Sequence, residues 1–168
     1  MEDQQIDITL TVNGTEIERS VRPRTLLSDF IRHELGLTGT HVGCEHGVCG
    51  MCTILMDDDT VRSCLTFAVQ ADGAEIETVE NLGSVEDLHP LQEAFTEEHG
   101  LQCGFCTPAM LLTGKALLAE NPDPSRDEIR EAVSNNLCRC TGYQDIIDSV
   151  ESAAEKMGGD SAAVGGDD

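Results

Sequence analysis

The chain has 168 residues, of which 39% are hydrophobic and 3% aromatic, and its formal net charge at pH 7 is −22. A surface this acidic repels nucleic acids and anionic membranes, so both are disfavoured as partners. No apolar run approaches the roughly 20 residues that span a bilayer, and no secretory signal is apparent at the N-terminus. We therefore expect a cytoplasmic protein. Its acidity is typical of adaptation to a salty cytoplasm, which we favour, or of docking to a basic partner.

The first third of the chain predicts a hairpin and a helix. Residues 6–12 alternate apolar and polar side chains, which is typical of a half-buried strand. An Asn-Gly turn signal follows, and residues 15–21 are predicted to return as the partner strand. Thr25 is expected to cap a helix that ends at Gly36.

A glycine-rich loop at residues 43–52 then carries the first cysteines. With one later cysteine they form a set of four candidate ligands: Cys44, Cys49, Cys52 and Cys64. Their spacing is that of a plant-type [2Fe–2S] cluster. The glycines let the backbone bend around a compact iron–sulfide core and aim N–H groups at it. His41 and His46 flank the set, and we expect them to pack the loop, since four cysteines complete the site.

Short strands are predicted after this loop, at residues 52–56, 60–69 and 76–79, with Cys64 on the second of them. Together with the hairpin and the helix they indicate a β-grasp layout, in which a helix lies across a mixed sheet. From about residue 81 the hydrophobic pattern changes to a helical period.

Four helices are predicted in the second half. The first begins at His89-Pro90 and the second at Thr107-Pro108, each with proline at its start. The third follows a capping box that begins at Ser125. The fourth runs from about residue 143 to 157.

A second set of four cysteines lies in the joints between these helices: Cys103, Cys106, Cys138 and Cys140. Antiparallel helices would bring both joints to the same end of a bundle. Because we expect no export, the thiols stay reduced, and metal binding is favoured over disulfides. The spacing alone leaves structural zinc open beside a second iron–sulfur cluster, which we favour.

Three motifs occur in order: Gly-Cys-Glu-His-Gly-Val-Cys-Gly-Met-Cys at 43–52, Gln-Cys-Gly-Phe-Cys-Thr-Pro-Ala-Met at 102–110 and Asn-Leu-Cys-Arg-Cys-Thr-Gly-Tyr at 136–143. Together they resemble the small iron–sulfur subunit of the molybdenum hydroxylases. That family includes xanthine dehydrogenases, aldehyde oxidoreductases and aerobic carbon monoxide dehydrogenases. The resemblance covers residues 5 to 157 and fills all eight ligand positions.

The resemblance implies an α+β chain with two [2Fe–2S] domains. A β-grasp, plant-type ferredoxin-like domain is expected at residues 1–82, with Cys44, Cys49, Cys52 and Cys64 as ligands. A four-helix-bundle domain is expected at residues 83–157, with Cys103, Cys106, Cys138 and Cys140 as ligands. Residues 158–168 contain only Gly, Ala, Val, Ser and Asp, and we expect a disordered acidic tail.

The resemblance also implies a function. In this family a separate large subunit binds molybdenum with a pterin cofactor and oxidises the substrate, and a flavin (FAD) subunit passes electrons on. Gln102 and the edge at Cys140 would face the pterin, and this chain would be an electron-transfer subunit of a hetero-oligomer without a substrate site. The alternatives are a stand-alone ferredoxin-like carrier, against which the second cysteine set argues, and a zinc-stabilised interaction module.

Overall fold

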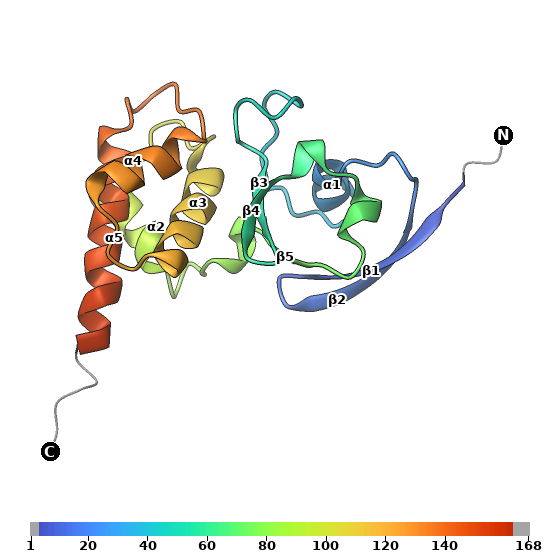
Figure 1. Cartoon of the computed structure of the whole chain (residues 1–168), viewed down its shortest axis with the longest axis horizontal. Coiled ribbons are helices and arrows are strands. Elements are labelled where there is room, and N and C mark those ends of the chain that lie inside the picture. The colour runs from blue at the N-terminus through green and yellow to red at the C-terminus, as the bar shows by residue number, and fades with distance from the viewer. Residues whose placement is uncertain (1–3, 163–168) are drawn as a thin grey trace, which may run out of the picture.

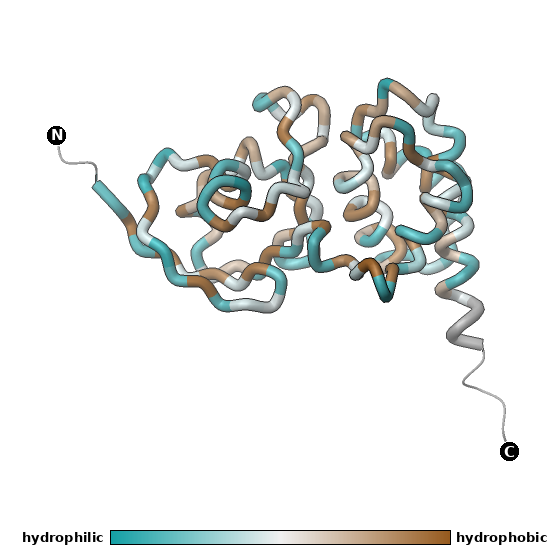
Figure 2. The backbone as a smooth tube through the Cα atoms, turned by 180° about the vertical axis from the view of Figure 1, so that it is seen from behind, coloured by the Kyte–Doolittle hydropathy of each residue, from teal (hydrophilic) through white to brown (hydrophobic). Residues whose placement is uncertain are grey.

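The structure is a computed structural model that describes residues 4–162. Figure 1 shows two lobes side by side, one built around a sheet and one built of helices. Each lobe has its own hydrophobic core, and Figure 2 shows hydrophobic stretches in both. Met51, from the first cysteine loop, is buried in the core of the helical lobe. The two lobes therefore meet at the cysteine loop.

The sheet lobe contains a mixed sheet with the strand order β2-β1-β5-β3-β4 within the described residues. The predicted hairpin is confirmed: β1 (Ile6–Val12) pairs antiparallel with β2 (Thr15–Val21). In the middle of the sheet β5 (Glu75–Glu77) pairs parallel with β1 and antiparallel with β3 (Thr53–Met56). At the far edge β4 (Asp59–Arg62) pairs with β3, and β3 packs against the helical lobe.

The helix across the sheet is shorter than predicted. It consists of α1 (Leu27–Asp29) and a π-helical continuation, η1 (Phe30–Glu34). The prediction that Thr25 caps it is wrong, since the N-cap residue is Leu26 and no side chain caps the helix. The reason is tertiary: the Thr25 carbonyl accepts a hydrogen bond from the Ala68 N–H, which holds this segment extended.

The predicted strand at residues 60–69 is also wrong in its second half. The strand β4 ends at Arg62, and Cys64 lies on a short 3₁₀ helix, η2 (Ser63–Leu65). Both the N–H and the hydroxyl of Ser63 donate to the Cys52 carbonyl, at 3.2 and 2.7 Å. These two bonds turn the chain toward the cysteine loop, and two further 3₁₀ helices follow, η3 (Ala68–Ala71) and η4 (Val79–Asn81).

The helical lobe contains four helices within the described residues, as predicted. These are α2 (Pro90–Glu97), α3 (Thr107–Glu120), α4 (Arg126–Ser134) and α5 (Gln144–Ala162). The capping box of α4 is confirmed, since the Ser125 hydroxyl accepts from the Glu128 N–H and the Glu128 carboxylate accepts from the Ser125 N–H.

The helix α5 continues to Ala162, beyond the predicted start of the tail at residue 158. The rest of the predicted tail lies outside the described residues. Over residues 4–162 we find no helix with both the length and the apolar character needed to cross a membrane.

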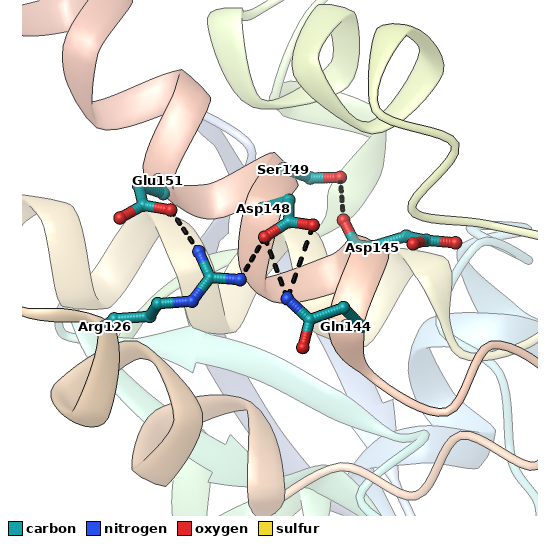
Figure 3. Close-up of polar contacts among 6 residues, drawn as sticks. All are labelled: Arg126, Gln144, Asp145, Asp148, Ser149 and Glu151. Carbon is teal, nitrogen blue, oxygen red and sulfur yellow. Dashed lines mark hydrogen bonds and ion pairs between the residues drawn. The ribbon is translucent and has the colours of Figure 1, made fainter.

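Figure 3 shows how α4 is fixed to α5. The Arg126 guanidinium pairs with Asp148 and Glu151, and Gln144 donates to the same Asp148 carboxylate. These groups are partly exposed, so each pair contributes little by itself. Burial of apolar side chains between the two helices supplies the main attraction. The α2–α3 and α4–α5 loops, which carry the cysteines, both lie near one end of the lobe.

Candidate metal centres

The first cysteine set divides into a buried pair and an outer pair. Cys52 and Cys64 are buried, whereas Cys44 and Cys49 are half-buried. The Cys64 thiol forms a hydrogen bond with the Cys52 thiol, and burial together with this contact raises the pKa of Cys64 to about 11. The charge on Cys44 also raises the pKa of Cys64, so sulfurs of the glycine-rich loop lie near that of Cys64, although Cys64 comes from a different segment of the chain.

Backbone N–H groups donate hydrogen bonds to the sulfur of Cys44. The N–H of Cys49 donates to the Cys44 Sγ at a distance of 3.4 Å. This bond, followed by that from the His46 N–H, lowers the pKa of Cys44 to about 6. The loop thus stabilises a thiolate, which is the ligand form of cysteine, and N–H groups on sulfur are typical of iron–sulfur sites.

The second set shows the same division. Cys106 and Cys138 are buried, whereas Cys103 and Cys140 are exposed, with 3.5 Å between the two exposed sulfurs. Burial, followed by a hydrogen bond with the Cys138 thiol, raises the pKa of Cys106 to about 12. The structure brings these four thiols together from the α2–α3 joint and the α4–α5 joint.

Polar groups near Cys138 favour its thiolate. Burial raises the pKa of Cys138, but hydrogen bonds from the Thr141 hydroxyl and N–H, the Cys140 backbone and the Cys106 thiol together outweigh it and lower that pKa. The Thr141 Oγ1 lies 3.1 Å from the Cys138 Sγ. The backbone N–H of Cys138 is held by the Tyr143 hydroxyl at 2.8 Å, which itself donates to the Asn136 carbonyl.

This arrangement fits a binuclear cluster better than a single ion. A tetrahedral zinc ion needs its ligand atoms around one point. Each set here consists of an outer pair and a buried pair of thiols. Two thiol pairs in each set instead match a [2Fe–2S] core, in which each of two irons takes two protein ligands.

Hydrogen bonds join the two sets across the lobe boundary. The Leu137 N–H donates to the Cys49 carbonyl at 2.8 Å. The fully buried Asn136 amide donates to the Thr113 hydroxyl at 2.6 Å and accepts from the Thr53 hydroxyl at 3.2 Å. The Arg62 guanidinium donates to the Asn135 carbonyl at 2.6 Å. The two cysteine loops are therefore fixed to one another.

The bridging roles of Asn136, Thr53 and Arg62 were not predicted. Their partners lie 23 to 83 residues away along the chain, so no local pattern indicates them. Thr141 has a local signal, because a hydroxyl three residues after a cysteine can reach back to it.

The histidines that flank the first set make hydrogen bonds to the backbone. The Nδ1 atom of His41 lies 2.8 Å from the Phe105 carbonyl oxygen, and that of His46 lies 2.5 Å from the Cys44 carbonyl oxygen. These contacts occupy one nitrogen of each ring, as expected of residues that pack the loop. Gln102 and Arg139 are exposed beside the second set.

Comparison with known proteins supports both centres. Residues 10–82 match the family model described as a 2Fe-2S iron-sulfur cluster binding domain, and residues 78–151 match that of a [2Fe-2S] binding domain. The chain is 61% identical over 150 residues to the caffeine dehydrogenase subunit gamma of Pseudomonas sp. (strain CBB1), covering 88% of this chain and 90% of that one.

Two solved structures have the same fold. Quinoline 2-oxidoreductase from Pseudomonas putida 86 matches with a TM-score of 0.87 at 56% identity, over 90% of this chain and 95% of the matched chain. The aldehyde oxidoreductase from Desulfovibrio gigas matches with a TM-score of 0.88 at 46% identity, over 92% of this chain but only 17% of that longer one.

Proposed function

Because this chain belongs to the small iron–sulfur subunits of the molybdenum hydroxylases, we propose how its residues carry out electron transfer. The chain is the iron–sulfur subunit of a multi-subunit oxidoreductase and contains two 2Fe-2S binding domains. The stand-alone carrier and the zinc module are not favoured, since both halves match [2Fe–2S] domains.

The ligands we propose are the two sets of cysteines. In the N-terminal set Cys44 with Cys49, and Cys52 with Cys64, would each hold one iron. In the helical set Cys103 with Cys140, and Cys106 with Cys138, would do the same. The observation that carries this assignment is that each set of four thiols consists of a buried pair and an outer pair.

When bound, a [2Fe–2S] cluster accepts and releases one electron at a time. The chain supplies rigid anchors and a connection between the two centres. The connection is the hydrogen bond from the Leu137 N–H to the Cys49 carbonyl. Leu137 directly precedes the proposed ligand Cys138, and Cys49 is itself a proposed ligand. Only backbone atoms and one hydrogen bond separate the two ligand sets at this point.

The partners we propose are a large molybdenum–pterin subunit and a flavin subunit. Gln102 and Cys140 would face the pterin, so that the helical centre receives electrons first. Both residues are exposed, and apolar side chains lie close to them in sequence: Leu101, Phe105 and Leu137. Exposed apolar groups on so acidic a chain are typical of an interface.

The N-terminal centre would face the flavin subunit. Val48 and Leu65, which lie in the cysteine loop and next to Cys64, are 71% and 59% exposed. We also propose that the sheet lobe is a β-grasp, ferredoxin-like domain at residues 1–82. The helical lobe would be a four-helix bundle at residues 83–157. The paired thiols and the two separate hydrophobic cores support this division.

A matched pair of ligand variants tests the assignment. Cys64→Ala and Cys106→Ala each remove one buried ligand from one set. We expect about four irons per chain in the wild type and about two in each variant. Electron paramagnetic resonance (EPR) of the reduced protein should show two binuclear signals, of which each variant loses a different one. Loss of both signals in one variant, or zinc in place of iron, would contradict the assignment.

A further inference from the structure

His41 and Phe105 contact each other across the lobe boundary in two ways. Their rings stack with 4.7 Å between the centroids and 13° between the planes. In addition, the His41 Nδ1 lies 2.8 Å from the Phe105 carbonyl oxygen. Because a carbonyl oxygen only accepts, this Nδ1 carries a hydrogen and donates it. Two independent contacts therefore join residues that are 64 positions apart.

The position of each residue relates this contact to the metal centres. His41 precedes Cys44 by three residues, and Phe105 lies between Cys103 and Cys106. The Phe105 ring also reaches the first cysteine loop: a Cβ on Gly43 would lie 3.6 Å from the Phe105 Cε1 and 3.2 Å from the Cys49 Sγ. The ring therefore belongs to the surroundings of both thiol sets.

A cavity of about 350 Å³ lies between the two sets and is lined by residues of both. Most of its lining besides the thiols is apolar, with contributions from Met51, Phe105 and Leu137. Phe105 lines this cavity and is 46% exposed, so it lies at the rim of the cavity. The His41 ring stacks on the Phe105 ring, and its Nδ1 donates a hydrogen bond to the Phe105 carbonyl.

We propose that His41 and Phe105 form a clasp that closes the space between the two clusters to water and fixes the distance between the two cysteine loops. His41 is then a positioning residue for electron transfer, because its hydrogen bond and its ring contact both go to Phe105. The proposal rests on the ligand assignment proposed above. Water near a cluster stabilises its reduced, more negative form, so opening the clasp should raise the reduction potential.

Single substitutions separate the two contacts of the clasp. His41→Phe keeps a ring for stacking and removes the hydrogen bond. His41→Asn keeps a donor and removes the ring, and Phe105→Leu keeps the backbone carbonyl and removes the stack. His33→Asn is the matched control, since His33 is exposed on η1 and belongs to neither cysteine loop.

The test is an EPR-monitored redox titration of the iron-loaded protein, together with the magnetic interaction between the two reduced clusters. We expect His41→Asn and Phe105→Leu to raise the reduction potential of at least one cluster and to weaken the interaction. We also expect iron retention against a chelator to fall about tenfold. The double variant should add little to the larger single effect, because the two residues act as a unit.

The proposal is overturned if these variants melt at lower temperature but keep wild-type potentials and magnetic interaction, since a merely structural contact would behave in this way. It is also overturned if they match His33→Asn in every measurement. His41→Phe, the mildest change, serves as the test if the other variants do not assemble. If the wild-type protein does not show two binuclear EPR signals, the ligand assignment itself is wrong. This outcome differs from a failure of the clasp, in which the wild type shows both signals and the variants behave like it.

Discussion

The backbone N–H of Leu137 donates a hydrogen bond to the carbonyl oxygen of Cys49, with 2.8 Å between nitrogen and oxygen. Cys49 belongs to the N-terminal thiol set, and Leu137 directly precedes Cys138 of the helical set. Asn136, next to Leu137, is fully buried and bonded to both lobes. Hydrogen bonds therefore join the two cysteine sets directly, although the sets come from different halves of the chain.

Replacing the Leu137 amide by an ester removes this donor and keeps the side chain. The Cys49 carbonyl then lacks its partner, and we expect the free energy of unfolding to fall by about 1–3 kcal/mol. Electron exchange between the clusters should become slower. Chemical denaturation and rapid-mixing reduction measure the two effects. The same ester at Leu88, in the exposed loop before α2, is the control. If both esters gave the same free energy of unfolding and the same rate of electron exchange, the hydrogen bond from Leu137 to Cys49 would not join the two centres.

Tyr143→Phe tests the hydroxyl that holds the helical cysteine loop. In the wild type this hydroxyl accepts from the Cys138 N–H and donates to the Asn136 carbonyl, at 2.8 and 3.1 Å. Its loss leaves both groups without this partner and should lower the free energy of unfolding by about 1–3 kcal/mol. The EPR signal of the helical cluster should change, whereas that of the N-terminal cluster should not. A change in both signals would argue against a local effect.

Gly50→Ala should disrupt the contact between the lobes. Gly50 has a φ of +76°, and a Cβ there would lie 2.2 Å from the Asn136 Oδ1 and 2.5 Å from the Asn135 carbonyl. Gly73 has a φ of +81° but open space around it, so Gly73→Ala controls for backbone strain alone.

We expect Gly73→Ala to cost about 1–2 kcal/mol of stability and to keep both clusters. Gly50→Ala should cost clearly more, because the backbone strain adds to a collision with backbone atoms. Thermal unfolding and iron content measure the difference. Similar losses of stability and iron in the two variants would show that the close contact of Gly50 with Asn135 and Asn136 does not contribute to stability.

The thiols of the iron-free protein should differ in reactivity. Backbone N–H groups lower the pKa of Cys44 to about 6, whereas burial raises that of Cys106 to about 12. Because the thiolate is the nucleophile, limiting iodoacetamide at pH 7 should label Cys44 early and Cys106 late. Lowering the pH through 6 should protonate Cys44 and slow its labelling. Peptide mass spectrometry follows both sites, and equal labelling would contradict the pKa shifts.

The acidic surface should make stability depend on salt. The chain has 32 acidic and 10 basic side chains, so its charges repel one another. Raising KCl from about 0.1 to about 1 M shortens the Debye length from about 10 to about 3 Å, and the melting temperature of the iron-loaded protein should rise. A melting temperature that stays constant or falls would contradict net repulsion among these charges.

The amino-acid sequence alone indicated eight cysteines as candidate iron ligands and predicted most of the helices and strands. Cysteine spacing, glycines between the cysteines and prolines at helix starts are local signals, because a ligand loop or a cap is built from residues close in the chain. The hairpin β1–β2, the four helices and the Ser125 capping box accordingly agree with the prediction.

Contacts between distant residues override local preference at several positions, and these positions become visible only in the folded chain. Thr25 does not cap a helix because its carbonyl bonds to Ala68, and Cys64 leaves the predicted strand because Ser63 bonds to Cys52. The joining of the two centres through Leu137, and of His41 to Phe105, depends on partners far apart in sequence. Such contacts leave no periodic pattern, because their energy is gained only when both lobes have folded and packed together.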